Sequence, residues 1–162
     1  MAPPLTIRRA ALADLESLVA GNAALALETE QLHLETGTLR EGIRAILDDR
    51  APGCYWVAEM DRRVVGQLLI TYEWSDWRNR MVWWIQSVYI APASRRHGVF
   101  RALYGHARAE AQRAGAGGLR LYVDATNAKA QAVYAALGMN GDHYRVFEEM
   151  FPGSPDGGRR GA

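Results

Sequence analysis

The stretch Arg95-Arg96-His97-Gly98-Val99-Phe100-Arg101 decides the interpretation of this chain, because it places three arginines and a glycine at the start of a predicted helix. Upstream, residues 81–90 (MVWWIQSVYI) are rich in β-branched and aromatic side chains and are followed by Ala91-Pro92, a pattern typical of a strand. Downstream, residues 99–114 repeat apolar or small side chains every three to four positions, which predicts a helix that ends near Gly115.

A basic turn between a strand and a helix favours an anion-binding site. The first N–H groups of a helix lack partners within the helix, and its dipole places partial positive charge there. Gly98 lets the main chain approach a ligand where a Cβ would intrude. The sequence therefore predicts a phosphate site here, although an ordinary turn with solvated arginines remains the alternative.

A second helix is predicted over residues 127–138, with Asn127 as its N-cap and Gly138 as its terminator. Asn127, Gln131 and Tyr134 are spaced by one and two turns, so they share one face of this helix. The predicted strand Leu119–Asp124 (LRLYVD) connects the two helices.

The order strand, R-x-x-G-x-x, helix, strand, N-x-x-A-x-x-x-Y-x-x-x-G resembles the GCN5-related N-acetyltransferase (GNAT) superfamily. The matching core runs from Gln86 to Met139, and the order of elements matches from Leu5 to Phe151. Members of this family transfer the acetyl group of acetyl-coenzyme A (acetyl-CoA) to an amine. Phe100 departs from the family pattern, which has a small residue at that position of the loop.

The resemblance implies a set of acetyl-CoA contacts and a direct attack of a primary amine in a ternary complex. Main-chain groups at the end of the strand would bind the pantetheine arm and polarise the thioester carbonyl, and Tyr134 would protonate the departing thiolate. The expected contacts are Val88, Tyr89, Ile90, Arg95, Arg96, His97, Gly98, Val99, Phe100, Arg101, Asn127, Gln131 and Tyr134.

The acceptor side needs a proton acceptor, because an alkylamine with a pKa of about 10.4 is mostly protonated at pH 7. In the histone-acetylating branch of the family a glutamate lies six residues before the strand-end position, which is Trp84 here. We expect Glu28 to be the base, with Glu30, Glu73 and a water held by Gln86 as alternatives. An ordinary solvated carboxylate also remains open for Glu28.

Aromatic residues cluster between positions 72 and 84. An aromatic wall beside a cationic acceptor is one interpretation, and packing in the core or in a dimer seam is the other. The expected acceptor-side residues are Glu28, Glu73, Trp74, Trp77, Trp84 and Gln86. The acceptor is a small-molecule amine or the amine of a protein or peptide.

Composition narrows the class of protein. A chain of 162 residues with 49% hydrophobic and 23% charged residues is typical of one globular domain. A net charge of +1 gives no reason to expect nucleic acid or membrane partners. Cys54 is the only cysteine and is expected to be buried, and the four histidines show no metal-ligand spacing. We expect a cytoplasmic enzyme that uses no metal. The exposed strand edge and the aromatic content also suggest a homodimer.

The elements follow the order βααβββαβαβ, which predicts an α/β (α+β) fold with a mixed, mostly antiparallel sheet of about six to seven strands flanked by helices. The last predicted strand is Tyr144–Phe151 (YRVFEEMF). Residues 1–151 are expected to form a single GNAT-like domain, and residues 152–162 a disordered tail. A non-catalytic acyl-CoA-binding or sensor module is the alternative to an enzyme.

Overall fold

The computed structural model describes residues 4–153. Its contacts divide the chain into two compact units, residues 1–120 and residues 121–162, and each is described here by itself. Among the described residues, no helix combines the length and the apolar character needed to cross a membrane.

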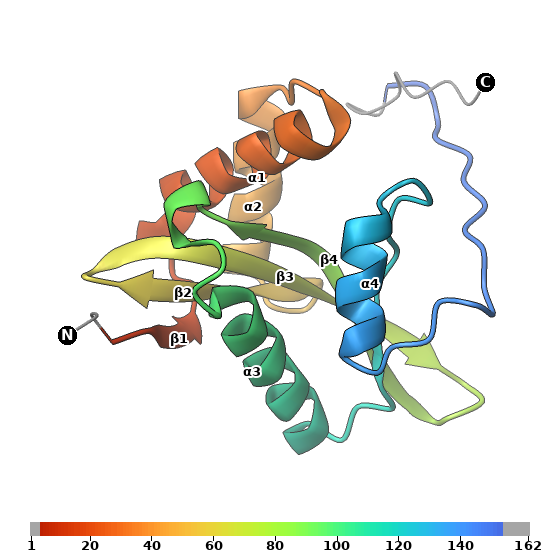
Figure 1. The fold of residues 1–162 in the computed structure, drawn as a ribbon. Helices are drawn as coiled ribbons and strands as arrows, with labels where there is room; N and C mark the ends of the chain where they lie inside the picture. Colours follow the sequence, from red (N-terminus) through yellow and green to blue (C-terminus); the bar gives the residue numbers. More distant parts are fainter. Residues whose placement is uncertain (1–3, 154–162) are drawn as a thin grey trace. The chain divides into compact units, whose positions relative to one another are not determined.

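The first unit holds a sheet and three α-helices (Figure 1). Two short 3-10 helices, η1 and η2, precede α1 and α3. In chain order the elements are β1 (Thr6–Arg9), η1 (Leu12–Asp14), α1 (Leu15–Glu30), α2 (Thr36–Asp48), β2 (Gly53–Met60), β3 (Arg63–Ser75), β4 (Arg80–Ile90), η2 (Pro92–Ser94), α3 (Val99–Arg113) and β5 (Leu119–Arg120).

The five strands of the sheet lie in the order β1-β2-β3-β4-β5. Every neighbouring pair is antiparallel except β4 and β5, which are parallel and pair only at Trp83 with Leu119 and at Trp84 with Arg120. The mixed, mostly antiparallel sheet is therefore confirmed, but the described chain has fewer strands than the six to seven predicted. The predicted strand Leu119–Asp124 stops at Arg120.

A tight turn sets the register of β2 and β3. Asp61 and Arg62 both have positive φ, at 48° and 61°, as a two-residue hairpin loop of the type I′ kind requires. The predicted hairpin about residues 61–63 is thus confirmed. It places eight residues of β2 against β3, with one irregularity after Ala58.

The helices cover both faces of the sheet, with α1 and α2 on one face and α3 on the other (Figure 1). On the α1 side, a buried cluster includes Leu18, Ile43 and Val57. On the α3 side, Leu103 and Ala107 are fully buried. Cys54 is buried as predicted, at 3% exposure.

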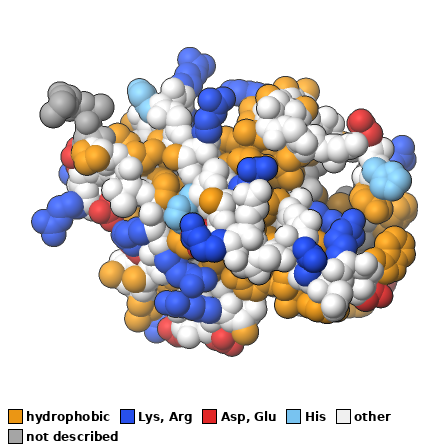
Figure 2. All heavy atoms as spheres, turned by 90° about the horizontal axis from the view of Figure 1, so that it is seen from below, with side chains coloured by type: hydrophobic (Ala, Val, Ile, Leu, Met, Phe, Trp, Pro, Cys, Tyr) orange, Lys and Arg blue, Asp and Glu red, His pale blue; other side chains and the backbone are white. Residues whose placement is uncertain are grey.

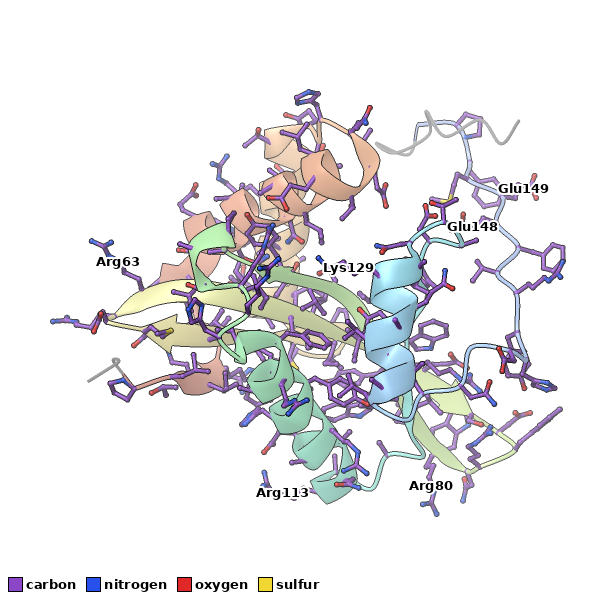
Figure 3. All side chains as sticks on the ribbon, viewed as in Figure 1. Arg63, Arg80, Arg113, Lys129, Glu148 and Glu149 are labelled. Atoms are coloured by element: carbon purple, nitrogen blue, oxygen red, sulfur yellow. The ribbon has the colours of Figure 1, made fainter. Side chains whose placement is uncertain are left out.

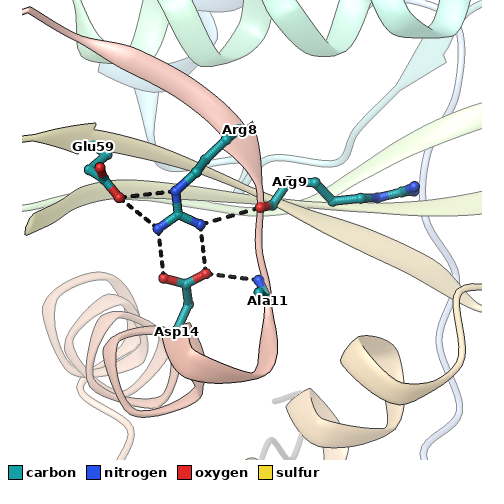
Figure 4. Close-up of polar contacts among 5 residues, drawn as sticks. All are labelled: Arg8, Arg9, Ala11, Asp14 and Glu59. Atoms are coloured by element: carbon teal, nitrogen blue, oxygen red, sulfur yellow. Dashed lines mark hydrogen bonds and ion pairs between the residues drawn. The ribbon is translucent and has the colours of Figure 1, made fainter. Parts of the chain in front are cut away.

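A charged cluster ties β1 to β2 and to the start of α1 (Figure 4). Arg8 donates two hydrogen bonds to the Asp14 carboxylate, at 2.8 and 2.9 Å, and two to Glu59 Oε2, at 3.0 and 2.7 Å. Asp14 also accepts from the Ala11 N–H at 2.8 Å. Both oxygens of the buried Asp14 carboxylate therefore accept hydrogen bonds.

The second unit contains α4 (Ala128–Ala136) and an extended segment that follows it. The predicted strand Tyr144–Phe151 does not form, and Phe147 is 92% exposed. A segment of this kind forms a strand only where a neighbouring strand accepts its hydrogen bonds, and no such pairing is present among the described residues. Of the predicted tail, residues 154–162 lie outside the described residues.

Candidate functional site

The end of β4 presents main-chain groups along one edge of the sheet. The Ala91 N–H donates to Val65 O on the β3 side at 2.9 Å. Because N–H directions alternate along an antiparallel strand, the N–H of Tyr89 also points toward β3, whereas those of Val88 and Ile90 point away from it. Within the described chain, β5 pairs with β4 only as far as Trp84, so this edge has no strand beside it.

A bulge in β4 redirects one side chain near this edge. Leu69 pairs with Ser87 and Ile70 with Ile85, which leaves Gln86 as the extra residue. The Gln86 amide nitrogen donates to Thr71 Oγ1 at 2.7 Å. The glutamine side chain also has an acceptor oxygen, so Gln86 can accept a hydrogen bond from a further donor. The sequence does not predict that Thr71 contacts Gln86, because this contact depends on how β3 pairs with β4.

The loop that follows β4 has the backbone shape of an anion site. Arg96 and Gly98 have positive φ, at 67° and 79°. The α3 hydrogen-bond ladder begins with the Ala102 N–H donating to Gly98 O at 3.0 Å, so the N–H groups of Val99 and Arg101 precede it. A Cβ at Gly98 would meet nothing within 4 Å, which means that this side of the main chain is open. The residues present therefore fit a diphosphate group.

Close packing fixes where α3 begins. Val99 is 1% exposed and lies against the sheet at Gly66. A Cβ at Gly66 would come within 2.8 Å of Ile90 Cδ1 and 3.0 Å of Val99 Cγ1. The absence of a side chain at Gly66 thus lets the start of α3 lie directly over the end of β4.

Positive charge surrounds this loop and continues along α3. Arg96, His97 and Arg101 are exposed, as are Arg108 and Arg113 further along the helix. Figure 2, seen from below the view of Figure 1, shows Lys and Arg side chains exposed on the surface. Such a surface attracts an anionic ligand.

Three of the predicted site residues contact one another, in an arrangement that we name the Glu28–Tyr89–Arg95 cluster. Arg95 Nη2 lies 2.6 Å from Glu28 Oε2, and Arg95 Nε donates to Ile90 O at 2.9 Å. The Tyr89 hydroxyl donates to Glu28 Oε1 at 3.3 Å. Burial, and then the Glu28 charge, raise the pKa of Tyr89 above its ordinary value. Glu28 and Arg95, expected to serve the amine and the phosphates separately, therefore form an ion pair.

A second carboxylate is held by residues of two neighbouring strands. Glu73 on β3 accepts from the indole N–H of Trp84 on β4, and its other oxygen accepts from Arg120 Nη1 of β5 at 2.8 Å. Two predicted acceptor-side residues, Glu73 and Trp84, are therefore brought together. Arg120 was missed, because no local pattern relates it to a residue 47 positions earlier.

The two remaining tryptophans of the predicted acceptor side lie elsewhere. Trp74 is 57% exposed and Trp77 is 88% exposed, and both belong to the β3–β4 hairpin, where Arg80 begins β4 (Figure 3). Val88 and Ile90 lie at the opposite end of β4. The structure thus separates these two aromatic side chains from the end of β4.

In the second unit, α4 begins and ends where the sequence predicts. The Asn127 side chain accepts from the Ala130 N–H at 3.0 Å, as an N-cap does, and Gly138 has a positive φ of 84°. The Gln131 amide nitrogen donates to two carbonyls of the preceding loop, at 3.0 and 3.1 Å. Lys129, the sole lysine in the sequence, is exposed on α4 (Figure 3).

Tyr134 lies on α4 and is half-buried. Burial raises the pKa of Tyr134 above its ordinary value. A phenol with a raised pKa remains protonated at neutral and moderately alkaline pH, so Tyr134 can act as a proton donor. No group of three or more His, Cys, Asp or Glu side chains in the described part of the chain is arranged to hold a metal ion.

Comparisons with known proteins relate this geometry to an enzyme class. The sequence profile of the Acetyltransferase (GNAT) family matches residues 23–139. A possible acetyltransferase from Clostridium difficile 630 is similar in structure, with 38% sequence identity and a TM-score of 0.86 over 91% of this chain and 97% of that chain. No curated protein matches the chain.

Two more distant structures share the fold alone. A ribosomal-protein-alanine N-acetyltransferase from Brucella melitensis biovar Abortus 2308 has 17% identity and a TM-score of 0.73 over 91% of this chain and 100% of that chain. An aminoglycoside N-acetyltransferase in complex with CoA has 16% identity and a TM-score of 0.77 over 93% of this chain and 97% of that chain.

Proposed function

Since the chain belongs to the GNAT acetyltransferase family, we propose that it transfers the acetyl group of acetyl-CoA to a primary amine. The observation that carries this proposal is the loop before α3. Its positive φ at Gly98, its open side and the N–H groups of Val99 and Arg101 are suited to a diphosphate. Arg96, His97 and Arg101 add exposed positive or hydrogen-bonding groups beside it.

The end of β4 is suited to the acyl group of the bound thioester. The N–H groups of Val88 and Ile90 point to the edge that no strand covers in the described chain. A main-chain N–H aimed at a thioester oxygen stabilises the charge that develops there during acyl transfer. We assign this role to the N–H groups of Val88 and Ile90. The N–H of Tyr89 does not take part, because it points toward β3.

Tyr134 is proposed as the proton donor to the departing thiolate. Its phenol is neutral at pH 7, and burial raises its pKa further. A neutral donor at this position avoids the release of a thiolate into solution, and general acid catalysis of this kind contributes about 10²–10⁴-fold to a rate. Asn127 and Gln131, which hold the start of α4, are proposed to present the same helix face to the cofactor.

On the acceptor side, we assign removal of the amine proton to a water held by Gln86. The two carboxylates Glu28 and Glu73 are each already engaged in an ion pair with an arginine, Arg95 and Arg120 respectively. Gln86, in the bulge, donates to Thr71 and can also accept a hydrogen bond through its side-chain carbonyl oxygen. Glutamine orients a water without itself taking the proton, so the proton passes to solvent.

Release of free thiol from acetyl-CoA tests the proposal. The purified protein is incubated with acetyl-CoA and, in turn, spermidine, kanamycin, lysine and an alanine-initiated peptide, and CoA binding is measured in parallel by calorimetry. We expect heat from CoA and thiol release that depends on an amine. Heat without amine-dependent release would instead support an acyl-CoA-binding module, and no heat at all would reject both functions.

A further inference from the structure

Arg95 is oriented by contacts with two other segments of the first unit. Its Nε donates to the carbonyl oxygen of Ile90 at 2.9 Å, and its Nη2 pairs with Glu28 at 2.6 Å. Its guanidinium lies 5.7 Å from the centroid of the Tyr89 ring. The side chain therefore points back over the end of β4 toward the C-terminal turn of α1.

The same contacts fix Glu28. One carboxylate oxygen pairs with Arg95, and the other accepts from the Tyr89 hydroxyl at 3.3 Å. The Glu28 side chain is still 40% exposed, and each carboxylate oxygen can accept more than one hydrogen bond. A cationic amine that arrives at the end of β4 can therefore still reach this carboxylate.

We propose that Arg95 is a positioning residue: it holds Glu28 and the end of α1 beside the end of β4, where Glu28 binds the acceptor amine, and it does not bind the diphosphate. This inference rests on the proposed function. It divides the basic loop into two parts, with Arg95 serving the acceptor side and Arg96 and Arg101 serving the nucleotide.

The geometry of the guanidinium makes the inference testable by conservative substitution. Arg95 uses two different nitrogens, one for the Ile90 carbonyl and one for Glu28. A lysine keeps the charge but has a single nitrogen, so it cannot reproduce both contacts. Lysine is, by contrast, an adequate point charge for a phosphate. Arg95→Lys therefore separates the two roles.

The experiment compares Arg95→Lys, Arg95→Gln and Glu28→Gln with the matched variant Arg101→Gln. Three quantities are measured: the Kd of CoA by calorimetry, amide hydrogen exchange in the last turn of α1, and the KM and kcat for the panel amine with the fastest thiol release. Circular dichroism and the Tm of each variant check that it is folded.

If Arg95 positions Glu28, all three cluster variants keep the Kd of CoA within about twofold and raise the amine KM about tenfold, more than they lower kcat. Exchange in residues 26–30 rises in both Arg95 variants, and the double variant Glu28→Gln/Arg95→Gln is no worse than either single variant. Arg101→Gln instead raises the Kd of CoA.

Three results would overturn the inference: a raised CoA Kd in Arg95→Gln that Arg95→Lys restores, tighter CoA binding in Glu28→Gln because Arg95 is released, or unchanged amine KM in every cluster variant. These outcomes differ from failure of the proposed function, in which the unmodified protein itself gives no heat with CoA or no amine-dependent thiol release.

Discussion

At the scale of single residues, Tyr134 carries the proposed chemistry on its hydroxyl group. Tyr134→Phe removes this proton donor and keeps the ring, so we expect kcat to fall about a hundredfold with little change in the KM for acetyl-CoA. Because burial raises the pKa of Tyr134, the unmodified enzyme should lose activity only at strongly alkaline pH. The measurement is kcat between pH 7 and pH 10.

The variant Tyr144→Phe is the control for this measurement, since Tyr144 is a tyrosine of the same unit with 73% of its surface exposed. It should behave as the unmodified protein does. Equal kcat for Tyr134→Phe and the unmodified protein over the whole pH range would remove Tyr134 from the mechanism.

Asp14 controls stability in acid. Its hydrogen bond from Arg8 lowers the pKa of Asp14 below its ordinary value, despite the opposing effect of burial, and the Ala11 N–H lowers it further. A lowered folded-state pKa means that the unfolded chain binds the proton more tightly. The stabilisation is therefore present above the ordinary carboxyl pKa and is lost as the pH falls through the lowered value.

Asp14→Asn should accordingly reduce the free energy of unfolding by about 2 kcal/mol at pH 7, because it leaves Arg8 with one fewer charged partner. The loss should shrink as the pH falls below the ordinary carboxyl pKa and through the lowered pKa of Asp14. Urea unfolding at a series of pH values measures both effects. Glu16→Gln, which removes an exposed ion pair with Arg40, should change little, and an equally large loss there would contradict the reasoning.

At the scale of elements, the position of α3 depends on Gly66 of β3. Gly66→Ala places a Cβ 2.8 Å from Ile90 Cδ1 and 3.0 Å from Val99 Cγ1, so the Ile90 side chain must move and we expect the start of α3 to shift slightly outward. We expect a loss of about 1–2 kcal/mol of stability. The Kd of CoA should also rise, because the loop before α3 moves with it. Urea unfolding and calorimetry measure the two effects.

Gly105→Ala in the middle of α3 is the matched control, because its new Cβ would meet nothing within 4 Å. This variant should be as stable as the unmodified protein or more so, since alanine favours a helix more than glycine does. A Gly66→Ala variant with unchanged stability and CoA affinity would show that α3 tolerates the extra atom.

Local signals in the sequence predict most of these elements correctly. The turn about residues 61–63, the start of a helix at Val99 and the Asn127 cap each depend on a few neighbouring residues, and all three are present. The start of α2 shows the limit of local reasoning. The sequence predicts that this helix opens at Gly37-Thr38, with Thr38 and Glu41 as a capping box. This prediction is wrong, because Glu35 is the cap, accepting from the Gly37 and Thr38 N–H groups, and α2 begins at Thr36.

Contacts between distant segments could not be predicted in the same way. Glu28 and Arg95 are 67 positions apart, and Glu73 and Arg120 are 47 apart. Such pairs depend on which strands are neighbours and in which register, and no single segment carries that information. The strand predicted at residues 144–151 failed for the same reason, because its sequence does not specify a partner strand.

At the scale of the whole molecule, a nucleotide that binds only the folded state should stabilise it. CoA at about 100 times its Kd should add about 2.7 kcal/mol. For a chain of this length, that corresponds to a rise in Tm of about 5–10 °C. Thermal unfolding with and without CoA measures this shift.

Pantetheine, which lacks the diphosphate, is the control ligand and should shift the Tm far less, because the loop before α3 is proposed to bind the phosphates. An equal shift from both compounds would place the main binding energy on the pantetheine arm instead. A single GNAT-like domain, a homodimer and a cytoplasmic location all stay predictions from the sequence.

The solitary lysine on α4 has a practical consequence for anyone who assays this protein. Apart from the terminal amine, Lys129 is the only primary amine that the polypeptide offers to an electrophile. Self-modification by the thioester would therefore add very few mass increments, and intact-mass spectra would separate it cleanly from turnover of an added acceptor. The same scarcity leaves α4 and the terminal amine as the places where amine-reactive dyes or surfaces attach.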